Sequence, residues 1–344
     1  MICSKYSPHN LLSHPFSRSS SMIVLILILN RLKLIKSDWD SWWTYEGISG
    51  PDFWGRLNPK WSHCSKGQRQ SPIDIDTDLL IYDSILRPIE IKGDQIDGRL
   101  INTGRSIDFE IDLSSSSSSS DQRRVLITGG PLSYQYTITN LTVHFGRKND
   151  RGSEHTINQK QFAGELQLYG YNSQLYTDWS DAKRSPNGLV AIAILIKISR
   201  NHSNNDQLSR LIESFKNTRN RGDSQSMYSL SLRKLLPITR QFVTYEGSLT
   251  QPACFETVQW IILNKPIYLS SNQLEQLRSF QSKLWDNYRP IQATNFRTIR
   301  TNIVNHRLLE NYRFKYQLDG REILTDVYHK HYCVVNQPIA YRST

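Results

Sequence analysis

Leu189-Val-Ala-Ile-Ala-Ile-Leu-Ile-Lys-Ile198 is the stretch of this chain that best indicates its fold. The run has the length of a strand and is apolar at both alternating positions, which is typical of a strand buried on both faces. The alternating runs Ser106–Leu113 and Tyr136–Val143 indicate further strands, and Gly129-Gly-Pro131 marks a turn. From Ser37 onward the sequence therefore predicts a mostly β fold.

Two segments indicate helices. Leu208–Phe215 lies within the polar, Arg/Asn/Ser-rich segment 204–234, which is interpreted as an insertion, and Ser271–Leu284 has helical apolar spacing with Ser271 as its N-cap. The serine run Ser114–Ser120 lies between strand-like runs and is predicted to be a solvated hairpin loop. The length favours two domains, but a mostly β domain can reach about 250 residues as one unit.

The chain is basic: its 344 residues include 42 Lys and Arg against 31 Asp and Glu, a formal net charge of +11. The composition excludes a polytopic membrane protein, a coiled coil and a collagen-like fibre. The excess of positive charge favours acidic partners such as polysaccharide, nucleic acid or anionic membrane. Glycine-rich phosphate loops, GxSxG and HExxH are absent from the sequence, which excludes the reaction classes that depend on them.

The N-terminal region resembles a secretory leader. Met22–Leu29 is an apolar run of eight residues, which is too short for a bilayer span of about 20 residues but fits the core of a signal peptide. The basic segment Asn30–Lys36 follows where a small-residue cleavage site is expected, and Met22 is an alternative start. A buried N-terminal strand is the other interpretation. We expect residues 1–36 to be a leader and the protein to be secreted.

Histidine spacing offers one conventional metal motif. His329 and His331, followed by Cys333, would share one face of a strand and could meet a soft metal, although an exposed tail that binds nothing specific is the simpler interpretation. His144 shares a strand face with Thr142, and a lone strand histidine is more often a hydrogen-bonded structural residue than a ligand.

Five ordered strings resemble those of α-class carbonic anhydrases, and the similarity runs from about Trp42 to Ile303. They are Gln70–Ile75, Gly152–His155, Ser185–Leu189, Gly247–Thr250 and Tyr288–Pro290. The chain is most similar to the non-catalytic branch of carbonic anhydrase-related proteins ten and eleven. This similarity rests on the strings Val143–Gly146, Gly164–Leu168, Lys183–Val190 (despite an added Arg184) and Arg300–Ile303.

The resemblance implies the α-carbonic anhydrase fold: a large, twisted, mostly antiparallel central sheet with short peripheral helices. It places this domain at residues 37–303, after the leader and before a basic C-terminal tail at 304–344.

The resemblance also identifies a vestigial zinc site. Active relatives, the type example of a three-histidine zinc centre, take two ligands from one strand and the third from its neighbour. These positions hold Thr142, His144 and Gln167, so one imidazole of three remains. The proton-shuttle position holds Arg105, whose pKa above about 12 prevents it from cycling a proton. We expect no bound zinc, no other cofactor and no catalysis.

The polar groups around that site match those of the enzymes more closely. Glu154 and Thr250 match the pair that orients the zinc-bound hydroxide, and Glu165 matches the carboxylate that supports the third histidine. Gln251 replaces a threonine that is common in active enzymes. Because such groups normally fix metal ligands, we expect them to persist here as parts of buried polar networks.

The resemblance pairs Cys64 with Cys254 in a disulfide, which would close a loop of about 190 residues and indicate an oxidising compartment. Two buried thiols are the alternative. Cys3 would leave with the leader, and Cys333 would remain as a free thiol or form an intermolecular disulfide.

Two further surface features bear on partners. Asn201 is the better glycosylation candidate, because the other sequon, Asn140, is predicted to lie in a central strand. The basic C-terminal stretch is either solvated surface or a contact for heparan sulfate, acidic protein or membrane. Nucleic acid is not expected as a partner of an exported chain that lacks a nucleic-acid motif.

Together these features predict a secreted, catalytically inactive carbonic anhydrase-related protein. The resemblance implies expression in the nervous system and binding to extracellular or cell-surface partners at synapses, of the neurexin type. The alternatives are a zinc hydratase or esterase with an altered metal site, and a polysaccharide-binding protein acting through the basic tail.

Overall fold

The computed structural model describes residues 42–113, 124–199, 205–280 and 284–304. The chain divides into two units, Met1–Trp42 and Trp43–Thr344, and the second contains all the described helices and strands. Among these residues, none of the helices combines the length and apolar character that a membrane span requires.

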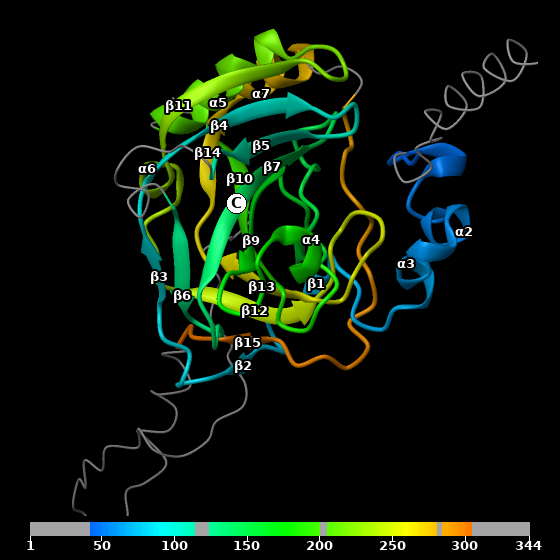
Figure 1. Ribbon diagram of the computed structural model, residues 1–344, viewed down its shortest axis with the longest axis vertical. Coiled ribbons are helices and arrows are strands. Elements are labelled where there is room, and N and C mark those ends of the chain that lie inside the picture. The colour runs from blue at the N-terminus through cyan, green and yellow to red at the C-terminus, as the bar shows by residue number, and fades with distance from the viewer. Residues whose placement is uncertain (1–41, 114–123, 200–204, 281–283, 305–344) are drawn as a thin grey trace, which may run out of the picture. The chain divides into compact units, whose positions relative to one another are not determined.

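Thirteen strands of the described chain form one large mixed sheet (Figure 1), in the order β11-β4-β5-β7-β9-β10-β13-β12-β15-β2, with β14 paired to β10, and β6 joining β3 to β7. Most neighbouring strands are antiparallel, and the parallel pairs are β10 with β13, β10 with β14, and β15 with β2. This confirms the predicted fold class. A separate parallel pair is formed by β1 (Asp74–Ile75) and β8 (Thr156–Ile157).

The strands of the large sheet have the following bounds: β2 Ile81–Tyr82, β3 Ile89–Lys92, β4 Gln95–Asn102, β5 Ile107–Ile111, β6 Leu126–Gly129, β7 Tyr136–Phe145, β9 Gly164–Asn172, β10 Leu189–Ser199, β11 Ser224–Ser231, β12 Phe242–Gly247, β13 Val258–Leu263, β14 Ile267–Ser270 and β15 Arg300–Thr301. The short helices are α2 Trp54–Leu57, α3 His63–Lys66, α4 Trp179–Ala182, α5 Asp206–Ser214, α6 Leu232–Leu235 and α7 Ser271–Phe280, with 3-10 turns at Gly47–Ser49, Pro59–Trp61 and Phe215–Asn217.

Strand β10 separates two hydrophobic cores, as its sequence predicts. Val190, Ile192 and Ile194 point into one core, which also contains apolar residues of α5 and α7. The alternate residues, including Ala191 and Ala193, point into the other core. Alanine on this second face leaves room for large aromatic rings, and Trp260 on β13 lies opposite Ala191.

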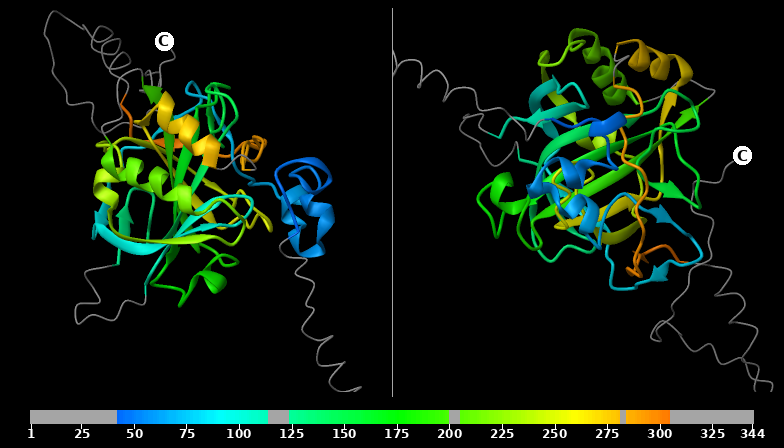
Figure 2. Two further views of the ribbon diagram at one scale, coloured as in Figure 1. Left: turned by 90° about the horizontal axis from the view of Figure 1, so that it is seen from above. Right: turned by 90° about the vertical axis from the view of Figure 1, so that its right-hand side faces the viewer.

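Helices α5 and α7 lie side by side (Figures 1 and 2), with α5 next to β11 and α7 next to β14. Helix α5 spans Asp206–Ser214, so it begins and ends slightly earlier than predicted. It begins at Asp206 because the Asn205 side chain accepts a hydrogen bond from the backbone N–H of Leu208 and caps the helix. Helix α7 is capped by Ser270, so the prediction of Ser271 was wrong. Ser270 Oγ accepts from the N–H of Gln273 while Gln273 Oε1 accepts from the N–H of Ser270, a reciprocal capping box.

The segment 204–234 is more regular than its polar composition indicated. Besides α5 it contains β11, which pairs with β4 at the end of the sheet. Only Met227, Leu230 and Ser231 of this serine-rich strand are buried, so its hydrophobic signal is weak. Part of this polar segment is therefore a strand of the large sheet, which its composition did not predict.

Candidate functional site

Strands β7 and β9 bring the three predicted ligand positions together. The two strands are antiparallel, with Thr142 directly opposite Gln167 and His144 directly opposite Glu165. All four side chains are buried. The site therefore lies inside the sheet, on positions that strand register fixes.

Gln167 uses every hydrogen-bonding position of its side-chain amide. Its NH₂ group donates to Glu154 Oε2 at 2.9 Å and to Glu165 Oε1 at 2.8 Å. Its carbonyl oxygen accepts from the Tyr169 hydroxyl at 2.6 Å and lies 3.0 Å from His144 Nε2. Burial, and next the charge of Glu154, raise the pKa of Tyr169 well above its usual value, so this hydroxyl remains a donor. The two carboxylates fix the orientation of the amide, because they can accept from its nitrogen but cannot donate to its oxygen.

His144 faces a hydrogen-bond acceptor at each ring nitrogen. Nδ1 lies 2.5 Å from the backbone carbonyl oxygen of Asn287, and Nε2 faces the carbonyl oxygen of Gln167. Because neither oxygen can donate, both contacts are hydrogen bonds only when both nitrogens carry protons, so this geometry favours the imidazolium.

The surroundings of His144 agree with a charged ring. Burial is the strongest single influence on the pKa of His144 and lowers it. The opposing influences together outweigh burial and raise the pKa above its ordinary value. They come from Glu154, whose Oε2 lies 3.7 Å from Nε2, from the Asn287 carbonyl and from Glu165. The buried carboxylates are thus balanced by a proton on His144, and neither ring nitrogen offers a lone pair to a metal.

Thr142, the other replaced position, is directed toward β5. Its hydroxyl donates to Asp108 Oδ1 at 2.9 Å, and the two residues lie opposite each other in the register of β5 and β7. Burial raises the pKa of Asp108, against the opposing effect of hydrogen bonds from Thr142 and Ser106. Thr142 is therefore hydrogen-bonded to Asp108 and does not take part in the hydrogen bonds of the Gln167 amide.

Glu154 and Thr250 are both buried, but no hydrogen bond joins them. The second carboxylate oxygen of Glu154 accepts from the backbone N–H of Arg289 at 2.9 Å. The Thr250 hydroxyl makes no hydrogen bond of good geometry within the described part of the chain. Both oxygens of Glu154 are thus engaged by Gln167 and Arg289, so the pair that the resemblance implied is not coupled in this structure.

Glu165 also supports a second buried histidine. Its carboxylate accepts from the backbone N–H of His155 at 2.8 Å and lies 2.8 Å from His155 Nδ1, while His155 Nε2 lies 2.7 Å from the Tyr245 hydroxyl. Burial raises the pKa of Glu165, but the charge and hydrogen bond of His155 and the amide of Gln167 outweigh it and lower the pKa overall. Glu165 is therefore ionised at neutral pH.

Arg105, which the resemblance assigns to the proton-shuttle position, stacks on an aromatic ring. It follows a tight turn after β4, where Asn102 Oδ1 accepts from the N–H of Gly104, whose φ of +83° favours glycine. Its guanidinium carbon lies 4.4 Å from the centre of the Trp43 ring. This cation–π contact holds a permanently charged group where a proton carrier would need to titrate.

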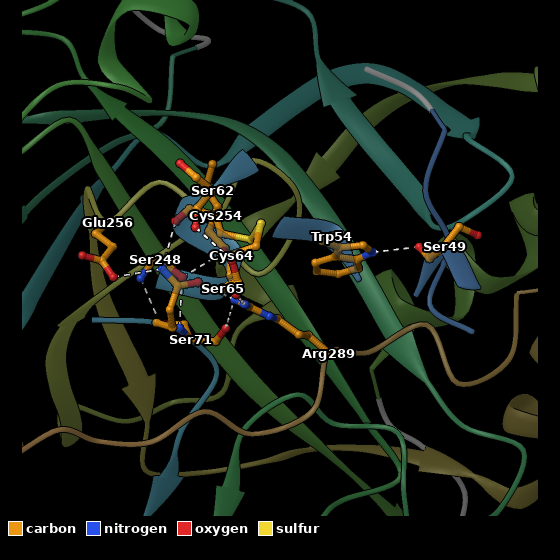
Figure 3. The surroundings of a disulfide bond; sticks show 12 residues. Ser49, Trp54, Ser62, Cys64, Ser65, Ser71, Ser248, Cys254, Glu256 and Arg289 are labelled. Atoms are coloured by element: carbon orange, nitrogen blue, oxygen red, sulfur yellow. Dashed lines mark hydrogen bonds between the residues drawn. A yellow bond between two sulfur atoms is a disulfide. The ribbon is translucent and has the colours of Figure 1, made fainter. Parts of the chain in front are cut away.

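The predicted disulfide between Cys64 and Cys254 is confirmed, with a sequence separation of 190. Figure 3 shows Arg289 directed toward it: its guanidinium donates to the carbonyl oxygens of Cys64 and Ser71 and to Gln70 Oε1. Burial lowers the pKa of Arg289 to about 10, against the opposing charge of Glu154. Arg289 thus connects the disulfide region to the buried polar site.

The donor set at positions 142, 144 and 167 does not fit zinc. A structural or catalytic zinc site needs several imidazole, thiolate or carboxylate ligands, whereas this site offers one imidazole with both nitrogens engaged. Residues 42–113, 124–199, 205–280 and 284–304 contain no group of three or more His, Cys, Asp or Glu side chains arranged to hold a metal. Of the remaining candidates, His329, His331, Cys333 and Asn201 lie outside the described residues.

Several contributors to the site were not predicted, among them Tyr169, Asn287 and His155. Tyr169 could have been predicted from the sequence, because residues 165, 167 and 169 share one face of a strand. His155 stands in the recognised string Gly152–His155 without any signal of its role. Asn287 is 143 residues from His144, so only the folded chain reveals their contact.

Comparison with known proteins agrees with this fold. A family profile for eukaryotic-type carbonic anhydrases matches residues 49–303. The chain belongs to the eukaryotic-type carbonic anhydrase family. Within it, the chain is 38% identical over 271 residues to carbonic anhydrase-like protein 2 of Caenorhabditis elegans, and the match covers 75% of this chain and 78% of that protein.

Proposed function

We propose that this protein is a secreted, catalytically inactive carbonic anhydrase-related protein that acts by binding an extracellular or cell-surface partner. The observation that carries the proposal is the side-chain amide of Gln167, which is fully hydrogen-bonded at the position of the third zinc ligand. The name of the C. elegans relative, a carbonic anhydrase-like protein, supports a role apart from the enzymes.

Loss of catalysis follows from the chemistry of the donor set. Carbonic anhydrases need zinc to lower the pKa of a bound water to about 7. One histidine whose ring nitrogens both donate cannot bind that zinc, and Arg105 cannot relay the proton that hydration of CO₂ releases. A hydratase or esterase with an altered metal site is the competing function, and it requires ligands that this buried site lacks.

Secretion is supported by the disulfide between Cys64 and Cys254 and by the leader-like run at Met22–Leu29. Disulfides persist in oxidising compartments and are rare in the cytosol. A protein that acts by binding needs a stable fold but no catalysis. The buried polar site, in which the Gln167 amide is fully hydrogen-bonded, fits such a role.

The partner proposed from family resemblance is a synaptic cell-surface protein of the neurexin type. The basic tail, residues 304–344, is proposed as a contact for acidic polysaccharide, Cys333 as the site of an intermolecular disulfide, and Asn201 as a glycan acceptor. Nucleic acid is not proposed as a partner.

The test uses the full chain, tagged and expressed in cultured mammalian cells. We expect to find the protein in the culture medium. We expect it to bind cells that display a neurexin-type receptor and not to bind mock-transfected cells, and heparinase treatment should change neither result. Heparinase-sensitive binding to both cell types would favour the polysaccharide alternative. Retention inside the cells, or CO₂ hydration by the purified protein, would overturn the proposal.

A further inference from the structure

A surface groove of about 620 Å³ lies away from the vestigial zinc site, between β3 and the segment that connects α6 to β12. Its apolar lining includes Ile89 and Ile91 of β3, Leu236, and Leu263 at the end of β13. Ile238 stands at its edge and is 92% exposed. Ile238 thus extends the apolar lining into solvent, and contiguous exposed apolar surface is a feature of interaction sites.

Three cations surround this apolar floor. Arg233, Arg240 and Lys265 line the groove, and all three are exposed. Within the described part of the chain, none of them lies within ion-pairing distance of a carboxylate. The lining contains no acidic residue, and Glu90, between the two isoleucines of β3, points to the opposite face of that strand. The groove is therefore apolar in its floor and positive at its edge.

The wall formed by residues 239–242 is held by side-chain hydrogen bonds. Asn302 Nδ2 donates to the carbonyl oxygen of Arg240 at 2.9 Å, and Asn302 Oδ1 accepts from the N–H of Phe242 at 2.9 Å. The N–H of Asn264 donates to the carbonyl oxygen of Gln241 at 2.9 Å. A wall fixed in this way loses little conformational freedom when a ligand binds.

Strand β3 offers a further contact. It pairs with β6 along one edge, and in the described chain no strand pairs with its other edge. The backbone groups along such an edge can pair with an extended peptide, whose alternate side chains then point to the same face as Ile89 and Ile91.

We propose that this groove binds an extended, acidic and aliphatic peptide segment of a partner protein. The aliphatic side chains would contact the apolar floor, and the carboxylates would pair with Arg233, Arg240 and Lys265. A nucleic acid fits poorly, because its bases are bound by stacking on aromatic rings and the groove lining contains none. The inference rests on the proposed function, in that it assigns a place and a chemistry to partner binding.

The test measures the fluorescence anisotropy of a labelled peptide, Glu-Ile-Glu-Ile-Glu-Ile, titrated with the full secreted chain. Arg240→Glu/Lys265→Glu is expected to weaken binding at least about tenfold, and Ile238→Ser, at an exposed position, is expected to weaken it as well. The matched control, Lys66→Glu/Lys148→Glu, changes two exposed lysines elsewhere and shifts the net charge in the same direction. It is expected to leave affinity nearly unchanged. A Gln-Ile-Gln-Ile-Gln-Ile peptide should bind weakly.

Several outcomes would overturn the inference. One is the absence of peptide binding, and another is a loss of peptide affinity in Lys66→Glu/Lys148→Glu as large as that in Arg240→Glu/Lys265→Glu. A third is binding only to vesicles of phosphatidylcholine and phosphatidylserine, which would make the groove a lipid site. Self-association abolished by Arg240→Glu/Lys265→Glu, without peptide binding, would assign the groove to a second copy. If the same variant still binds receptor-displaying cells normally, the groove proposal fails while the proposed function stands.

Discussion

His144 Nε2 lies 3.0 Å from the side-chain carbonyl oxygen of Gln167, so two residues that the family resemblance assigns to zinc-ligand positions contact each other. The proton on His144 supplies one positive charge to a buried cluster that contains Glu154 and Glu165. In an enzyme of this family a zinc ion would supply the charge at this position. A proton on His144 thus offsets part of the negative charge of these carboxylates, and the Gln167 amide donates a hydrogen bond to each of them.

Replacing Gln167 should show how much this network stabilises the fold. Gln167→Leu removes hydrogen bonds to two buried carboxylates, each bond being worth about 1.5–3 kcal/mol, so we expect the free energy of unfolding to fall by about 3–6 kcal/mol. Gln68→Leu, at an exposed glutamine, is the control and should change it by about 0.5 kcal/mol or less. Urea denaturation measures both. Equal losses in the two variants would show that the network contributes nothing special.

The charge on His144 predicts a pH dependence of stability. Because its pKa in the folded protein lies above its value in the unfolded chain, about 6.5, protonated His144 contributes its full stabilisation below about pH 6.5. That contribution is lost as the pH rises through the folded-state pKa. The difference in unfolding free energy between wild type and His144→Gln should therefore shrink as the pH is raised from 6 to 9 in about one-unit steps. A difference that grows with pH would contradict a charged His144.

The disulfide should be a major source of stability. Cys64 and Cys254 are separated by 190 residues, and closing a loop of that length stabilises by about 5 kcal/mol in the chain-entropy model. Cys64→Ser/Cys254→Ser should lower the thermal midpoint and the unfolding free energy of the secreted protein accordingly. Cys333→Ser serves as the control. If the double variant and the control melt alike, the bond does not stabilise the native fold.

The sequence predicted the parts of the fold that composition determines directly. The apolar run of β10 indicated burial on both faces, and the structure places its alternate residues in two separate cores. Strand β11 was not predicted, because only three of its eight residues are buried and the others include several serines and the exposed Tyr228. The pairing of Cys64 with Cys254 came only from family resemblance, since cysteine spacing alone does not specify a partner.

At the site, sequence reasoning named the ligand positions but not what they now do. The hydrogen bonds of Gln167 depend on strand register, which brings His144 of β7 near it, and on Glu154 from a loop. The contact of His144 with Asn287 depends on tertiary folding over 143 residues. Periodicity cannot report either arrangement, because it describes one segment at a time.

The most direct test of the account combines zinc analysis by mass spectrometry with stopped-flow CO₂ hydration on the purified secreted protein and on Thr142→His/Gln167→His. Wild type is predicted to hold no stoichiometric zinc and to leave hydration at the uncatalysed rate. The double variant, which restores the three imidazoles on β7 and β9, is predicted to bind zinc and to accelerate hydration. Stoichiometric zinc in wild type, together with hydration above the uncatalysed rate, would contradict the account.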